Sequence, residues 1–447
     1  MKGDVPPIEV KASTAVLADF NARDSNKIDK EVRKMKKTFM TLLAIFLLSL
    51  FFSGGYAAEI KVGHLLPLSG HAAAPIGQEM LAATQLAIKH VNDSGGIKSL
   101  GGATIKLVTV DTHGDPQNGM TLTERLINVE KVPVIIGAYQ SAVTFPSTAV
   151  AEKYKIPWIV DLAAKAEITE RGFKYVFRPA QCASAGNADS TIEFLKWIGE
   201  KTGRPAKTMA MVYENTDWGQ DLAKTLRRRA PEIGVKIALD EPYPPNSANL
   251  RPLAVKIKGV NADVISITGY TADDISLCKL IETLRIEPMA VIWSGAGSLD
   301  QSFIPSIGRR GTNYNYTADG WGGYDACVRT PWAKKVWDDF KQMTGKNMSE
   351  LSVDAYVAAR VLAEALEKVK STEPEAIRNA LSKIKIKGEL ADFLGFPIEF
   401  DEKGQNPYKK YVTKQIYEGN YHLVWPPHLA SREFKPVWPV PKWDERK

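Results

Sequence analysis

The feature that most limits how this chain can fold is a regular alternation of short β-branched runs with amphipathic stretches from residue 60 onward. Several runs are almost continuously apolar, as expected of strands in a parallel sheet that is covered on both faces. Between them, apolar residues recur every three or four positions in 80–91, 122–129 and 277–284, which is typical of helices with one buried face. The alternation predicts an α/β fold with mainly parallel sheets flanked by helices. The predicted strands are 60–65, 104–110, 132–136, 156–160, 208–213, 235–239, 263–268 and 290–293.

Residues 35–58 have the order of a secretory signal peptide: a short basic start, an apolar run over 39–52 and then small residues. Gly55 and Ala57 suit the −3 and −1 positions of a signal peptidase site. The alternative is a membrane anchor, but the fourteen residues of the run fall short of the about 20 that cross a hydrocarbon core. We therefore expect cleavage and export to the periplasm. Residues 1–34 are polar and mixed in charge, and we interpret them as a non-native or disordered extension.

Charge and cysteine content exclude several classes of protein. Beyond residue 58 the chain carries 49 Lys and Arg against 45 Asp and Glu, a net charge of +4 without a basic block. Nucleic acid is therefore not expected as a partner. Cys182, Cys278 and Cys327 are too scattered for a disulfide framework or a zinc site, and we expect all three to be mostly buried. We expect no metal and no cofactor.

The remaining chain is long enough for two domains, since about 390 residues follow the leader. Turn-forming segments at 177–180 and 312–323 are predicted to be the connections that leave each half. From residue 425 the tail carries five prolines. They exclude a regular helix, and we expect this tail to run extended along the surface.

Three loops after predicted strands have the composition of a ligand site: 137–146, 161–167 and 214–219. In open α/β sheets, ligands bind beyond the carboxyl ends of the strands, where helix N-termini offer free N–H groups. The first two loops suit a carboxylate or another anionic oxygen, held by backbone N–H groups and by Ser141 or Thr144. Phosphate-loop, dinucleotide, zinc-protease and nucleophile-elbow motifs are all missing from the sequence, so we do not expect an enzyme.

Six segments in this order, 60–70, 77–96, 137–146, 168–177, 213–222 and 400–404, closely resemble the leucine/isoleucine/valine-binding family. Members are the extracytoplasmic receptors of branched-chain amino-acid ABC transporters. The resemblance implies a type I periplasmic-binding fold, in which two similar α/β lobes joined by three crossovers close on a ligand. It places 59–178 and 320–396 in the first lobe. The second lobe would combine 179–319 with 397–447, which includes the C-terminal tail.

The resemblance also implies ligand-binding residues. Ser141 matches the hydroxyl that holds the head group, with Ala142 and Thr144 beside it. The loop that contains Ala163 and Ala164 resembles a loop of backbone donors, although Ala164 stands where the family usually has a threonine. From the second lobe, Tyr270 matches an aromatic contact, and Trp218 replaces a tyrosine that covers the ligand.

The largest departure from the family is Ala296, which lies where amino-acid binders carry a glutamate that pairs with the ligand ammonium. An ammonium buried without a partner costs several kcal/mol. Either another acid replaces the glutamate, with Asp161 the first candidate and Asp325 the second, or the ligand lacks an amino group.

These features predict a solute-binding protein that delivers a small carboxylate-bearing solute, by default a branched-chain or other hydrophobic amino acid, to an ABC importer. One alternative is a binder of aromatic or aliphatic carboxylates without an amino group. Another is a ligand-sensing receptor domain, which would need a transmembrane helix or DNA-binding head that is not seen after residue 58. The expected partners are the ligand and the permease and ATPase subunits, and the expected state is a monomer.

Overall fold

The computed structural model describes residues 30–41, 58–320 and 329–446. The chain forms two compact units, Met1–Ala57 and Ala58–Lys447. In the first unit, residues 30–41 form a largely exposed helix. Most of the apolar run and the cleavage region of the predicted signal peptide lie outside the described residues, so the leader stays a prediction. Within the described ranges, no helix combines the length and the apolar character needed to span a membrane.

The first sheet of the larger unit contains five parallel strands in the order β2-β1-β3-β4-β5. The chain runs from β1 to β2 and then returns to the other side of β1 to form β3. This reversal of strand order leaves a crevice at the carboxyl ends of β1 and β3, where open α/β sheets bind ligands. The elements are β1 (Glu59–Leu66), α2 (Ala74–Asp93), η1 (Lys98–Leu100), β2 (Thr104–Asp111), α3 (Pro116–Asn128), β3 (Ile135–Gly137), α4 (Ser141–Lys153), β4 (Trp158–Val160), α5 (Glu167–Glu170) and β5 (Val176–Phe177).

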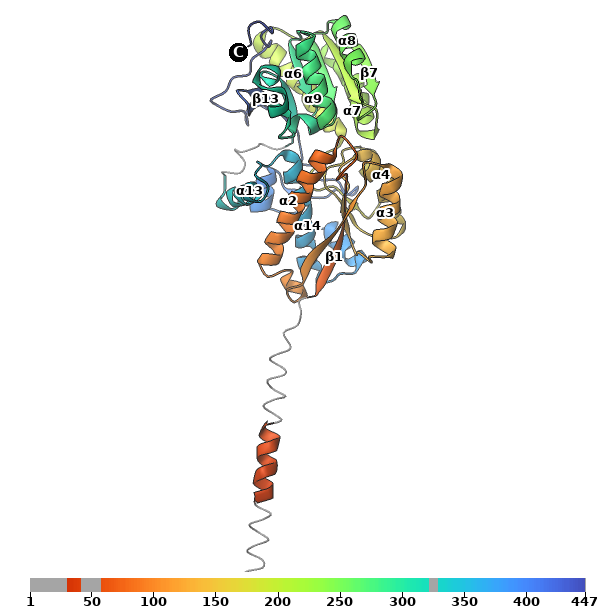
Figure 1. Cartoon of the computed structure of the whole chain (residues 1–447), viewed down its shortest axis with the longest axis vertical. Helices are drawn as coiled ribbons and strands as arrows, with labels where there is room; N and C mark the ends of the chain where they lie inside the picture. The colour runs from red at the N-terminus through yellow and green to blue at the C-terminus, as the bar shows by residue number, and fades with distance from the viewer. Residues whose placement is uncertain (1–29, 42–57, 321–328, 447) are drawn as a thin grey trace, which may run out of the picture. The chain divides into compact units, whose positions relative to one another are not determined.

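Helices cover both faces of this sheet (Figure 1). Successive residues of β3 enter different cores because side chains of a strand alternate between its faces. Ile135 packs in the core that includes α3 and α4, and Ile136 packs in the core that includes α2 and α14. The later elements that complete this lobe are α13 (Pro331–Thr344), α14 (Glu350–Val369), α15 (Pro374–Leu381), β11 (Lys385–Ile386), α16 (Glu389–Leu394) and β12 (Ile398–Glu399).

The second sheet has seven strands in the order β14-β13-β10-β9-β8-β6-β7. Its five strands from β7 to β10 are parallel, whereas β13 and β14 pair antiparallel at the other edge. The strand order reverses between β6 and β8, which makes a second crevice at their carboxyl ends. The elements are α6 (Ser184–Thr202), β6 (Thr208–Glu214), α7 (Asp217–Arg229), η2 (Ala230–Ile233), β7 (Lys236–Tyr243), α8 (Arg251–Val260), β8 (Val264–Thr268), α9 (Thr271–Thr283), β9 (Ala290–Trp293), η3 (Ala296–Leu299), α10 (Phe303–Ile307), α11 (Arg309–Thr312), β10 (Tyr316–Asp319), β13 (Val412–Tyr417) and β14 (Asn420–Trp425).

The predicted α/β class is confirmed, and every predicted strand is present, with shifted ends. The prediction that 312–323 is a connection was wrong in part, because this segment contains the strand β10. Its sequence is short and polar, and its strand conformation depends on pairing with β9 and β13 on either side. The chain passes from one sheet to the other lobe after β5, β10 and β12. We retain the predicted lobe boundaries as a proposal.

The tail beyond β14 has neither helix nor strand in its described residues, as predicted. It is anchored by two buried tryptophans. The indole N–H of Trp438 donates to the carbonyl oxygen of Arg204 at 2.9 Å, and that of Trp443 donates to Ile286 at 2.8 Å. Cys182 and Cys278 are buried free thiols, as expected, and Cys327 lies outside the described residues.

Candidate functional site

The first wall of the candidate site is the loop between β3 and α4, at the switch point of the first sheet. Ser141 is the first residue of α4 and is buried. Its Oγ accepts hydrogen bonds from the N–H groups of Ala164 at 3.1 Å and Lys165 at 3.0 Å. Among the hydrogen bonds of the described residues, none uses the N–H of Ser141 or Ala142. The partial positive charge of this helix end therefore favours an anionic group.

Two polar residues of this wall hold the backbone. The Thr144 hydroxyl accepts from the N–H of Ala138 at 3.1 Å. Asp161 is fully buried, and its Oδ1 accepts from the N–H groups of Tyr139 at 3.0 Å and Leu162 at 2.7 Å. Burial raises the pKa of Asp161 to about 7. Tyr139 has a φ of 66°, a left-handed conformation that is costly for a residue with a side chain, and the Asp161 bond helps to hold it.

The second wall comes from the second lobe and is aromatic. Trp218 lies in the first turn of α7, and Tyr270 precedes α9, so each follows one of the two strands at the second switch point. The ring centroids of Trp218 and Tyr270 are 5.5 Å apart, and those of Tyr139 and Tyr270 are 6.1 Å apart. Edge-to-face and tilted contacts of this kind bring aromatic rings from both lobes together.

The start of α7 is fixed by Glu214 at the end of β6. Its two carboxylate oxygens accept from the N–H groups of Gly219 at 2.7 Å and Thr216 at 2.8 Å. A Cβ at Gly219 would lie 2.1 Å from the carbonyl oxygen of Glu214, so only glycine fits this close approach. The packed turn sets the position of Trp218.

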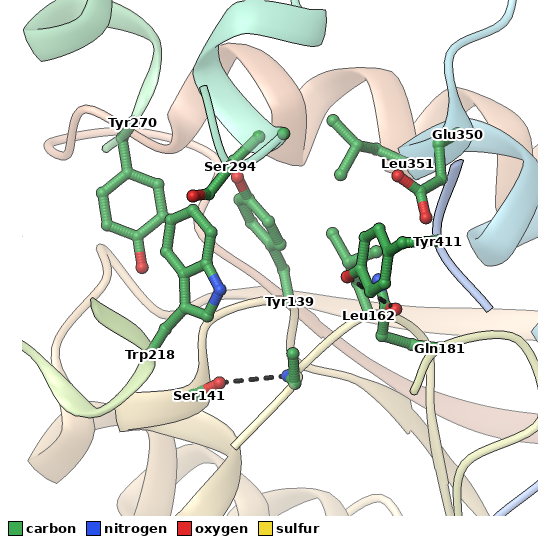
Figure 2. A pocket seen from close by; sticks show the side chains of 13 residues that line it. Tyr139, Ser141, Leu162, Gln181, Trp218, Tyr270, Ser294, Glu350, Leu351 and Tyr411 are labelled. Atoms are coloured by element: carbon green, nitrogen blue, oxygen red, sulfur yellow. Dashed lines mark hydrogen bonds between the residues drawn. The ribbon is translucent and has the colours of Figure 1, made fainter. Parts of the chain in front are cut away.

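Between the walls lies a small cavity. Figure 2 shows its lining side chains, which come from both lobes. The predicted residues Ser141, Ala164, Trp218, Tyr270 and Ala296 line this cavity. The other predicted residues, Ala142, Thr144, Asp161 and Ala163, lie next to it without lining it. Asp325 lies outside the described residues.

The sequence reasoning did not name eight further lining residues as ligand contacts: Tyr139, Leu162, Gln181, Ser294, Gly295, Glu350, Leu351 and Tyr411. Tyr139 and Leu162 lie in the predicted loops and could have been named from them. Gln181 and Tyr411 lie on crossovers between the lobes, where no local pattern marks a ligand contact. Glu350 begins α14, and an acid in a first helical turn is most often explained by the helix dipole.

A buried charged cluster lies behind Glu350. Lys409 Nζ is 3.4 Å from Glu350 Oε1 and 2.9 Å from Asp354 Oδ1, and all three side chains are almost fully buried. Burial opposes the charge of Lys409, but the Asp354 and Glu350 carboxylates outweigh it and raise the pKa of Lys409. Beside the cluster, the Tyr411 hydroxyl donates to Gln181 Oε1 at 2.8 Å. This end of the cavity is therefore polar.

Polar contacts also join the lobes around the cavity. Lys165 Nζ of the first lobe is 2.8 Å from Asp217 Oδ1 of α7, and the N–H of Ala166 donates to Asp221 at 3.0 Å. Elsewhere, Asn347 and the side chain of Gln301 exchange two hydrogen bonds. These contacts describe a closed arrangement. Among the described residues, no three His, Cys, Asp or Glu side chains gather as possible metal ligands.

Comparisons with known proteins agree with this architecture. Residues 59–419 match the family described as periplasmic binding protein. The chain is 29% identical over 384 residues to the Leu/Ile/Val-binding protein homolog 7 of Brucella abortus, covering 85% of this chain and 94% of the relative.

Solved structures share the fold. The branched-chain amino acid transporter substrate binding protein LivJ of Streptococcus pneumoniae, in complex with isoleucine, has a TM-score of 0.71 at 21% identity, over 82% of this chain and 100% of that one. A solute binding protein of an ABC transporter from R. palustris, in complex with benzoate, has a TM-score of 0.71 at 18% identity, over 82% and 95%.

Proposed function

Since the chain belongs to the periplasmic binding protein family, we propose that it captures a small carboxylate-bearing solute by lobe closure and delivers it to an ABC importer. The observation that carries this proposal is the cavity between the lobes, with Ser141 and the N-terminus of α4 on one wall and an aromatic wall opposite. The helix end attracts a carboxylate, and the rings of Trp218 and Tyr270 suit an apolar body.

The site favours a carboxylate without an α-amino group over a branched-chain amino acid. Ala296 lines the cavity where the resemblance predicts an acid, and Asp161 binds backbone N–H groups beside it. No described acid other than Glu350 lines the cavity. Solved relatives of the same fold were crystallised with isoleucine and with benzoate, so the fold accommodates either class.

A thermal-shift screen of the purified chain against amino acids, aromatic acids and aliphatic acids tests the proposal. A ligand at 100 times its dissociation constant adds about 2.7 kcal/mol of stability, which raises the melting temperature visibly. We expect acids without an α-amino group to raise it more than leucine, isoleucine or valine. A shift produced by these amino acids alone would favour the amino-acid reading, and no shift with any carboxylate would contradict the proposal.

The family and the leader-like segment together support an extracytoplasmic location, with export through the predicted signal peptide to the periplasm. The partners in this proposal are a membrane permease and its ATPases, which would contact the rims of the two lobes. The protein would act as a monomer and without a cofactor.

A further inference from the structure

Glu350 places a carboxylate at the end of the cavity away from Ser141. Figure 2 shows the two side chains at opposite sides of the cavity, with Tyr139 and Leu162 between them. Glu350 is 2% exposed and is the first residue of α14. Its neighbour Ser349 caps this helix through a reciprocal pair of bonds with Ser352, so the backbone that carries Glu350 is fixed.

The Glu350 carboxylate is also fixed from behind. Lys409 lies 3.4 Å from its Oε1, and the backbone of residue 320 packs so closely that a Cβ there would lie 1.8 Å from the same oxygen and 2.5 Å from Lys409 Cε. Gly320 therefore leaves room for this pair. A carboxylate has about four lone-pair positions, so a contact with an ammonium leaves it able to accept further hydrogen bonds.

Lys409 does not need Glu350 as its main counter-ion. Its ammonium is closer to Asp354, at 2.9 and 3.3 Å from the two oxygens. Asp354 also neutralises Lys409, and it does not line the cavity. Neutralising Lys409 therefore does not require a carboxylate at the cavity wall. Glu350 instead contacts the lysine and lines the cavity at once.

We propose that Glu350 is a specificity-determining residue that accepts a hydrogen bond from a hydroxyl or amino group at the end of the ligand away from its carboxylate. This inference rests on the proposed function, which places the ligand carboxylate at Ser141. Between the two polar ends, Leu162, Leu351 and the aromatic rings enclose an apolar body. The substrate class is thus a carboxylic acid with an apolar or aromatic middle and a distal donor.

An α-amino acid held at Ser141 through its carboxylate does not place its ammonium at Glu350. Its ammonium is on the carbon next to the carboxylate, whereas Ser141 and Glu350 lie on opposite sides of the cavity (Figure 2). A ligand held at Ser141 through its carboxylate reaches Glu350 only with a group at its far end.

The test is a titration by isothermal calorimetry with two pairs of acids that differ in a distal hydroxyl and in length. The pairs are benzoate with 4-hydroxybenzoate, and 3-phenylpropanoate with 3-(4-hydroxyphenyl)propanoate. The ethers with a methoxy group in place of the hydroxyl keep the oxygen and lose the donor. A hydrogen bond to a charged acceptor predicts at least about tenfold tighter binding of the hydroxy acid in one of the pairs.

Glu350→Gln should reduce this ratio to about threefold or less, because the acceptor loses its charge. Glu364→Gln on the same helix is the matched control, since Glu364 lies outside the cavity, and it should leave the ratio unchanged. Melting temperatures without ligand check that both variants fold. The wild-type ratio is informative even if Glu350→Gln does not fold.

The role of Glu350 and the binding of carboxylates can fail separately. Equal affinities within both wild-type pairs, or a ratio that Glu350→Gln leaves unchanged, would overturn the role of Glu350 while carboxylate binding stands. If none of these acids binds although another carboxylate raises the melting temperature, the role of Glu350 falls while the proposed function stands. If no carboxylate binds at all, both fail.

Discussion

Glu79 allows a quantitative prediction, because it is a buried carboxyl at the junction of two helices. It lies on α2, is 5% exposed, and its Oε1 accepts from the N–H of Ser349 at 3.3 Å and from the Ser349 hydroxyl. Burial raises the pKa of Glu79 from 4.5 to about 7, although the bonds from Ser349 and Ser352 act in the opposite direction. Glu79 thus joins α2 to the residue that caps α14, next to Glu350.

The sign of the pH effect follows from this shift. The folded state holds the proton of Glu79 more tightly than the unfolded state, so the contribution is fully present below pH 4.5 and is lost as the pH rises to about 7. A difference of about 2.5 pKa units at 1.36 kcal/mol each gives a loss of about 3 kcal/mol. Glu79→Gln has no such proton, and its amide oxygen can still accept from Ser349.

We therefore expect Glu79→Gln to equal the wild type in stability near pH 4.5 and to exceed it by up to about 3 kcal/mol at pH 8. Urea denaturation of both proteins across this range measures the difference, and other titrating groups cancel in it. A stability difference that does not change between pH 4.5 and 8 would refute the reasoning. So would a variant that becomes less stable than the wild type as the pH rises.

Three further changes address the cavity. Trp218→Ala should weaken ligand binding by about tenfold or more, since a large ring leaves the aromatic wall; an unchanged dissociation constant in calorimetry would place Trp218 outside the site. Ser141→Ala should reduce affinity for carboxylates and cost about 1–3 kcal/mol of stability in urea, because the N–H groups of Ala164 and Lys165 lose their acceptor. Lys165→Met removes the partly exposed ion pair with Asp217 that joins the lobes. It should weaken ligand binding a few fold without lowering the melting temperature of the ligand-free protein. A variant whose ligand-free melting temperature also falls would contradict a role in closure.

The strands and helices of this chain could be predicted because their patterns are local. Buried parallel strands such as 290–293 are apolar throughout, and the helices between them repeat their apolar positions with the helical period. The strand at 316–319 could not be found in this way. Apart from Ala318, its residues are polar or aromatic, and the segment around it is rich in turn formers. Its conformation comes from the strands that pair with it on both sides.

Site residues that come directly after strands could be predicted from the sequence, whereas site residues on the crossovers could not. Ser141, Trp218 and Tyr270 come directly after strands at the two switch points, and the fold class alone directs attention to those loops. Gln181 and Tyr411 are more than 200 residues apart in the sequence and meet through a hydrogen bond between two crossovers. No spacing rule connects such positions.

The class of ligand and its identity are determined by different parts of the chain. The helix end at Ser141 is a backbone feature that any sequence with this fold can offer to a carboxylate, so it fixes the class of ligand but not its identity. The side chains that could distinguish one carboxylate from another, Gln181, Glu350 and Tyr411, lie on the crossovers or at the start of α14. Because Glu350 pairs with Lys409 on the last crossover, a ligand that binds Glu350 also bears on a segment that connects the lobes. Recognition of the distal group and closure would then be coupled, and a distal donor should slow dissociation of the ligand more than it speeds association.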